Sequence, residues 1–342
     1  MATTGQGKTR GQLGYGDGRA TIREGDDVLL DEEAMVAELL ALLEAPDYRP
    51  PTLPVVAVEL MTLSGRADVA IEDVVALLER DSLIAGRVLN VASSAALAGA
   101  ARIGSLREAT MRLGLLRVRD LVMQIAMNLH VFKCEAYDAA MERVRRHAVA
   151  TAHLCRTVCK YTAIEGEFAF MAGLLHDVGI AGTLLALADR KRPRGRRPPD
   201  LISIWPAVDR VHVHAGEIMA RHWQLPPDIR LAIGAHHQVL CGGHPHPLAA
   251  TIALANEIAH AEGAGLVEKH GGEVATAEGS AETTHAVAVA STADWTSAFS
   301  ALDRTGPKTL ASAGAALGLD DRVHGLIVAE AKSLLDALVV EA

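Results

Sequence analysis

The sequence predicts an all-α fold. Half of the 342 residues are hydrophobic but only 3% are aromatic, so the core must be built mainly of Ala, Leu and Val. That composition favours closely packed helices over sheets. Apolar residues recur at helical spacing along most of the chain, and no strand-like alternation of any length is seen. The length suggests two or three structural units.

Charge and cysteine content restrict the class of protein. The formal net charge of −9 argues against binding DNA through a general positive field. We recognise no run of about 18 apolar residues that would span a bilayer, and residues 1–27 lack the apolar core of a signal peptide. The 4 cysteines do not form a disulfide framework in a chain this long. We therefore expect a cytoplasmic protein with no membrane contact.

The first half of the chain predicts a tail and then a helical bundle. Residues 1–46 comprise a tail and one helix over 28–44, and a proline cluster from Pro50 to Pro54 marks the boundary. Residues 47–135 form the next unit. Within it Asp81 or Ser82 can cap a helix, and Ser105 with Glu108 makes a capping box. Gly114 interrupts the helix that follows.

The second half, residues 136–342, predicts another helical bundle. Helices are expected over 137–161, 167–178, 212–223, 227–236 and 249–261. Gly179 is expected to end the helix over 167–178, which places His176 and Asp177 in its last turn. A segment near 263–285 is rich in Gly, Ala, Thr and Glu and predicts a mobile insertion.

Side chains that could bind a metal fall on different predicted helices of this second bundle. A ring of such residues pointing into a helical bundle is how these folds build metal sites. One or two divalent ions there could activate a water and polarise a phosphoryl oxygen, as in a phosphoester hydrolase. For His176 and Asp177 the alternative is a hydrogen-bonded pair with no metal. The candidate ligands are His147, His176, Asp177, His212, His236, His237 and Asn256.

Other polar residues have a structural interpretation that we prefer. Cys155 and Cys159 lie one turn apart and could share a metal, but two small buried hydrophobes are the simpler reading. The six cations between Arg190 and Arg197 could hold a phosphate or an acidic partner, although such a loop is usually solvated. Trp223 is expected to anchor the core. His237 could reach a second ion or a bound anion. Five other histidines of this half are expected at the surface or in loops: His214, His222, His244, His246 and His260.

The order of these motifs resembles a known family. His147, then His176-Asp177, His212 and His236-His237 resemble the HD superfamily of metal-dependent phosphohydrolases. The whole region from about Pro50 onward resembles its HDOD branch, which is related to the HD-GYP phosphodiesterases. The resemblance implies two packed helical bundles, the second HD-like, that form one HDOD body in bacterial signal transduction. The front half contributes three stretches to it: Leu53–Pro54, Glu79–Ser94 and Ile103–Ala109.

Departures from the HD pattern decide which activity the resemblance implies. The last HD position is usually an aspartate, whereas Asn256 brings no negative charge to a metal. The lysine and the Gly-Tyr-Pro triplet of active HD-GYP enzymes are also missing: Ile180 and Ala181 follow Gly179, and residues 238–243 contain no such triplet.

Two functions follow from the resemblance and its departures. We favour a non-catalytic regulatory module that binds a signalling protein or a small nucleotide-type ligand. The alternative is a metal-dependent phosphohydrolase or phosphodiesterase on a nucleotide or cyclic dinucleotide, with Asp177 catalytic. The expected cofactor is one or two ions of iron, manganese or nickel, or none. The sequence leaves the oligomeric state open.

Overall fold

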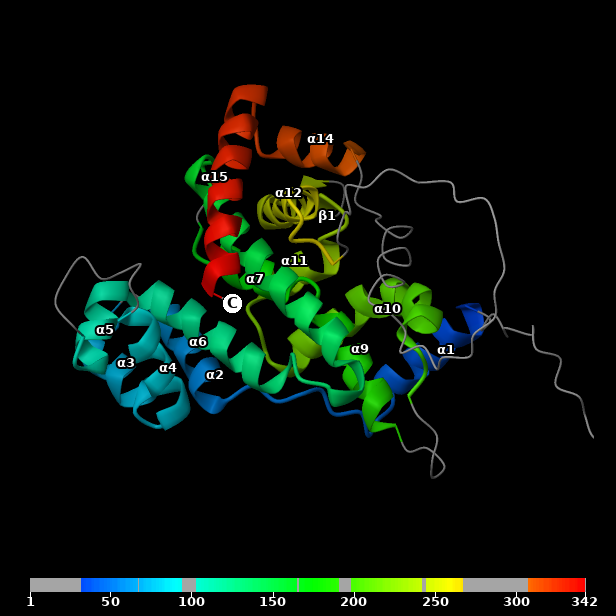
Figure 1. Cartoon of the computed structure of the whole chain (residues 1–342), viewed down its shortest axis with the longest axis horizontal. Coiled ribbons are helices and arrows are strands. Elements are labelled where there is room, and N and C mark those ends of the chain that lie inside the picture. The colour runs from blue at the N-terminus through cyan, green and yellow to red at the C-terminus, as the bar shows by residue number, and fades with distance from the viewer. Residues whose placement is uncertain are drawn as a thin grey trace, which may run out of the picture.

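The computed structural model describes residues 32–66, 68–93, 103–164, 166–190, 198–241, 244–266 and 307–341. These residues are almost entirely helical, which confirms the predicted all-α class (Figure 1). Within them, β-structure is limited to a two-stranded antiparallel pair, β1 (Leu240–Cys241) and β2 (His244–Pro245).

The front bundle is built as the sequence predicts. Asp81 accepts hydrogen bonds from the backbone N–H groups of Leu83 and Ile84, and Ser105 Oγ accepts one from the N–H of Glu108 at 3.2 Å. Gly114, at φ 79°, separates two helices. The bundle comprises α2 (Val55–Ser64), α3 (Ile71–Leu78), α4 (Ser82–Ala92), α5 (Leu106–Leu113) and α6 (Leu115–His130).

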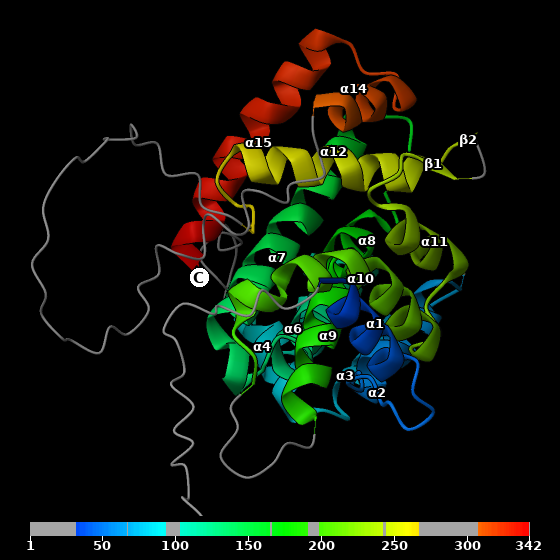
Figure 2. The ribbon, with the colours of Figure 1, turned by 90° about the vertical axis from the view of Figure 1, so that its right-hand side faces the viewer.

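The second bundle is arranged around one long helix, α7 (Asp138–Lys160), which follows the short 3-10 turn η2 (Glu135–Tyr137). Helix α7 packs against α8, α12 and α15, which cross it in Figures 1 and 2. The other helices are α8 (Ala169–Leu175), α9 (Val178–Asp189), α10 (Leu201–His222), α11 (Pro227–Ala235), α12 (Pro247–Ala261), α14 (Pro307–Ala316) and α15 (Asp321–Glu341).

Helix α1 (Glu32–Leu43) packs against α10 and α9 of the second bundle. Its Leu39 and Leu43 are buried in the same core cluster as residues of α9 and α10, and Arg210 of α10 forms ion pairs with its first turn. The described part of the segment 1–46 therefore packs against the second bundle, although the proline cluster that follows it predicts a boundary there. Residues 1–31 lie outside the described part of the chain.

The prediction that Gly179 ends a helix is wrong. Helix α8 ends at Leu175, α9 begins at Val178, and His176 and Asp177 form the turn between them. Gly179 lies in the first turn of α9, where a Cβ would come within 1.8 Å of the His212 carbonyl oxygen. Its lack of a side chain lets α9 and α10 touch backbone to backbone. That requirement comes from a tertiary contact, which local pattern does not reveal.

Helix α10 begins at Leu201, so His212 lies near its middle and not at its start as predicted. Pro206 sits inside this helix. Because an interior proline weighs against a helix, the sequence pattern understates this element.

The stretch Ala169–Asp189 is long and apolar enough to cross a membrane, by length and mean hydropathy (1.6), contrary to the sequence prediction. However, 94% of it is buried inside the described structure, where it forms α8 and α9. Its apolar character is explained by its place at the core of the second bundle.

Candidate metal centre

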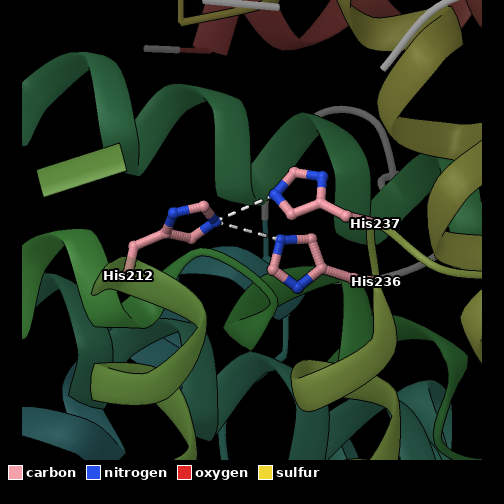
Figure 3. Close-up of side chains that lie close together, drawn as sticks. All are labelled: His212, His236 and His237. Carbon is pink, nitrogen blue, oxygen red and sulfur yellow. Dashed lines mark hydrogen bonds between the residues drawn. The ribbon is translucent and has the colours of Figure 1, made fainter. Parts of the chain in front are cut away.

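The predicted histidines and Asp177 converge in the interior of the second bundle. His147 comes from α7, His176 and Asp177 from the turn between α8 and α9, His212 from α10, and His236 from the end of α11. All five side chains are buried, with exposed fractions between 0% and 5%. His237 lies beside His236 at the edge of the group (Figure 3).

Asp177 stands at the centre of the group. Its Oδ2 lies 3.1 Å from His176 Nε2 and 3.6 Å from His147 Nε2. Its Oδ1 lies 3.2 Å from His236 Nε2 and 3.6 Å from His212 Nε2. One carboxylate thus faces two pairs of imidazoles, one pair on each oxygen.

Backbone carbonyls fix the tautomer of four of these imidazoles. A carbonyl can only accept, so each Nδ1 facing one carries the proton, and the Nε2 lone pair is left for the centre. This arrangement is typical of histidines that bind metal through Nε2. The four contacts are His147 to Ala264 (3.1 Å), His176 to Gly173 (2.8 Å), His212 to Asp209 (2.5 Å) and His236 to Ile233 (2.6 Å).

The Nε2 atoms lie too close to one another to be satisfied by protein alone. His147 and His176 approach to 3.3 Å, and His212 lies 3.3 Å from His236 and 3.0 Å from His237 (Figure 3). Two lone pairs at that distance repel unless a metal ion or a proton lies between them. The ligand atoms form two groups, His147–His176–Asp177 and His212–His236–His237, each within 4.8 Å. This donor set fits a divalent metal ion.

The electrostatics keep three of the histidines in the neutral form that a metal requires. Burial lowers the pKa of His147 to about 3, of His212 to about 4 and of His237 to about 2, so all three are neutral at pH 7. Burial alone would raise the pKa of Asp177, but the neighbouring imidazoles, His176 first, hold it well below its ordinary value. The centre therefore offers three neutral imidazoles beside an ionised carboxylate. Burial acts to lower the pKa of His176, but the adjacent Asp177 carboxylate outweighs it and raises that pKa above its ordinary value.

Asn256 lies on α12 with 4% of its surface exposed, and its Oδ1 is buried with no hydrogen-bond partner among the described residues. His260, four residues later, shares its helix face and lies against His147, with ring centroids 4.9 Å apart. This face of α12 thus covers the centre. The prediction that His260 is a surface residue is wrong, and the spacing of Asn256 and His260 was the available signal.

Several residues that the sequence analysis set aside have structural roles. Trp223 is 5% exposed and donates a hydrogen bond from Nε1 to the carbonyl of Pro51 at 2.8 Å, which confirms it as a core anchor. Burial raises the pKa of both Cys155 and Cys159, so these thiols are protonated. This agrees with the reading of both as small hydrophobes.

Surface positions account for other polar residues. His214 Nε2 lies 2.9 Å from Oε1 of Glu44, the residue that follows α1. His246 caps α12 by accepting a hydrogen bond from Ala249 N. Arg190 forms an ion pair with Glu38 of α1. The rest of the basic segment, residues 191–197, and most of the expected insertion, 267–285, lie outside the described residues.

The sequence did not reveal that two glycines, Gly179 and Gly216, set the geometry of the centre. Gly216 lies on the face of α10 that meets α9, so it and Gly179 together form the close contact. That contact brings His212 beside Asp177. The four-residue spacing of His212 and Gly216, which puts both on one face of a helix, was a signal for this.

Comparison with solved structures places the fold among bacterial proteins. An HDOD domain protein of unknown function from Geobacter sulfurreducens aligns with a TM-score of 0.58 and 22% identity, over 91% of this chain and 96% of that one. A Shewanella amazonensis protein described as a candidate metal-dependent phosphohydrolase aligns with a TM-score of 0.54 and 17% identity, over 88% and 99%. At these identities the likeness concerns the fold alone.

Sequence comparison identifies the family. An uncharacterised protein of Treponema pallidum is 25% identical over 221 residues, which are 60% of this chain. The chain spans about two fifths (41%) of the length of that curated relative. The profile described as HDOD domain matches residues 51–239, more than half of the 342 residues. The chain therefore belongs to the HDOD domain family.

Proposed function

We propose that this protein is a regulatory module of bacterial signal transduction that acts in the cytoplasm by binding a partner protein or a small ligand. In this proposal the metal centre contributes to the structure of the module and does not perform catalysis. The burial of the centre carries the proposal. A phosphoester substrate must place a phosphoryl oxygen on the ion, but the five central ligands are 0–5% exposed.

The surroundings of the centre also support a binding role. Phosphoryl transfer depends on cations placed around the transferred group. After Asp177, however, the chain continues with apolar residues of α9 that are buried in the core, such as Ile180 and Ala181. Asn256, at the usual position of the last HD aspartate, supplies a neutral amide. An ion bound here would polarise a coordinated water, but the chain offers little to hold a substrate against it.

The retained ligands support a second candidate function, that of a metal-dependent phosphohydrolase. Both ligand groups are complete enough to hold an ion, and Asp177 lies between them. In that case Asp177 would be the catalytic carboxylate, and a nucleotide or cyclic dinucleotide would be the substrate class.

Metal analysis combined with a hydrolysis assay separates the two. The purified protein is analysed for iron, manganese and nickel, and is then assayed with bis-p-nitrophenyl phosphate at pH 7–8 with each ion added. We expect bound metal and no turnover above that of Asp177→Ala. Turnover that Asp177→Ala abolishes, in a variant that still folds by circular dichroism, would establish the hydrolase instead.

A further inference from the structure

A large cleft lies between the two bundles. Its volume is about 1100 Å³, and its walls come from α4 and α6 of the front bundle, α7 of the second, the segment after α12 and the end of α15. In Figure 1 the end of α15 approaches the region where α7 meets the front bundle. None of the candidate metal ligands lines this cleft.

The cleft carries a small excess of positive charge, because four arginines and three acidic residues line it: Glu142, Glu262 and Asp336. Arg87 of α4 and Arg143 and Arg146 of α7 line it, and none of the three forms an ion pair among the described residues. Arg145 also lines it but is bonded to Glu142. Three cations from two helices thus face one space in a chain whose net charge is −9.

Two polar atoms of the cleft wall are buried without a partner. Arg143 Nη1 and Asn128 Oδ1 have no hydrogen bond within the described structure. Leaving a buried donor or acceptor unpaired is unfavourable, the more so for a charged group.

Apolar side chains line the same cleft. Leu83 and Val91 of α4 are 54% and 41% exposed there, and Leu121 and Val149 contribute from α6 and α7. An inorganic anion would leave this surface uncovered. A ligand that also has an apolar or planar body would cover it, and ligand sites typically combine such a wall with a few polar groups.

We propose that this cleft binds a phosphorylated small molecule of the nucleotide class, with its phosphates on Arg87, Arg143 and Arg146 and its body against Leu83 and Val91. The inference deepens the proposed function, because it names the ligand class of the module. It requires nothing of the metal centre.

The test uses ATP and inorganic pyrophosphate as probes, titrated into the full-length protein by isothermal titration calorimetry. We expect ATP to bind more tightly than pyrophosphate, since only ATP covers the apolar wall. The double variant Arg87→Ala/Arg146→Ala should weaken ATP binding about tenfold or more, because both arginines make charge-assisted contacts. Both side chains are exposed, so the variant should fold. Arg322→Ala, an exposed arginine near the other end of α15, is the matched control and should bind as wild type.

A second variant distinguishes the cleft from a diffuse charge effect. Gly86 of α4 lines the cleft, and a Cβ added there meets nothing within 4 Å, so Gly86→Phe should fill the space without disturbing the fold. It should abolish ATP binding although every arginine remains. Unchanged binding in Gly86→Phe, or no binding of either probe at millimolar concentration, overturns the proposal. Arginine-dependent binding of a poly-glutamate peptide in place of ATP also overturns it, in favour of an acidic protein partner. Hydrolysis of bis-p-nitrophenyl phosphate would refute the non-catalytic role but leave these binding results intact.

Discussion

The substitution Gly179→Ala should damage both the stability of the protein and its metal centre. The added Cβ would lie 1.8 Å from the His212 carbonyl oxygen and 2.5 Å from the Gly216 nitrogen. To restore an ordinary contact of about 3.4 Å, α9 and α10 must separate by about 1.6 Å. Both atoms belong to the backbone, so no side-chain rotation can relieve the clash.

The expected magnitude follows from that displacement. Overpacking a core costs ~1–3 kcal/mol, and a clash against backbone belongs at the upper end, about 3 kcal/mol. At about 2.1 cal/mol/K per residue, the 342 residues unfold with an entropy of about 0.7 kcal/mol/K, so 3 kcal/mol lowers Tm by about 4 °C. Metal sites tolerate ligand displacements of only ~0.2 Å, so moving His212 away from Asp177 by several times that distance should weaken metal binding by at least tenfold.

The assay is differential scanning calorimetry with and without added metal, together with competitive metal titration. Gly325→Ala in α15 is the matched control, because its Cβ meets nothing within 4 Å and alanine is the better helix former. The control should keep metal affinity and raise the free energy of unfolding by ~0.5–1 kcal/mol. Wild-type Tm and wild-type metal affinity in Gly179→Ala would refute the argument that this glycine sets the position of His212.

Three further predictions concern the centre, the caps and the response to acid. Asn256→Asp should tighten binding of manganese about tenfold or more in a calorimetric titration, because it adds a charged oxygen ligand. It should also lower the Tm of the metal-free protein, because the new charge is then buried without a partner. Equal affinity would show that Asn256 does not reach the ion. Ser105→Ala should lower the free energy of unfolding by about 1 kcal/mol in urea, through loss of the hydrogen bond to Glu108 N, with the exposed Ser93→Ala expected to change little. Burial and the nearby Arg156 and Arg117 lower the pKa of His153 to about 4. As the pH falls, His153 is therefore protonated near pH 6.5 in the unfolded chain but only near pH 4 in the folded protein. Stability should therefore fall as pH drops through that window, and His153→Gln should make the fall less steep between pH 7 and pH 5 in urea titrations; parallel slopes would contradict this.

Features that depend on short-range pattern were predictable from the sequence. The helical class, the caps at Asp81 and Ser105 and the break at Gly114 all follow from local residue preferences, and the structure bears them out. The capping box is half formed, because the Glu108 carboxylate accepts a hydrogen bond from the N–H of Gly104 in place of that of Ser105. The metal ligands could be named because each polar residue interrupts an apolar helix face, where burial needs a partner.

Features that depend on contact between distant segments were not predictable. The break between α8 and α9 places His176 and Asp177 in a turn, and it is stabilised by the approach of α10 to Gly179. The docking of α1 on α10 depends on Leu39 and Leu43 finding a surface that the pattern of α1 alone does not specify. Likewise, the spacing that carries Asn256 and His260 gives no indication of which neighbour they face.

The hydrogen bond from His147 Nδ1 to the carbonyl of Ala264 connects the candidate metal centre to the cleft between the bundles. Ala264 also lines the cleft between the bundles. An ion on Nε2 and a molecule seated against Ala264 would thus act on opposite edges of one imidazole ring. Thermodynamic reciprocity then requires each to alter the affinity of the other by the same factor. The module would report, in a single output, both the supply of a metal and the level of a metabolite.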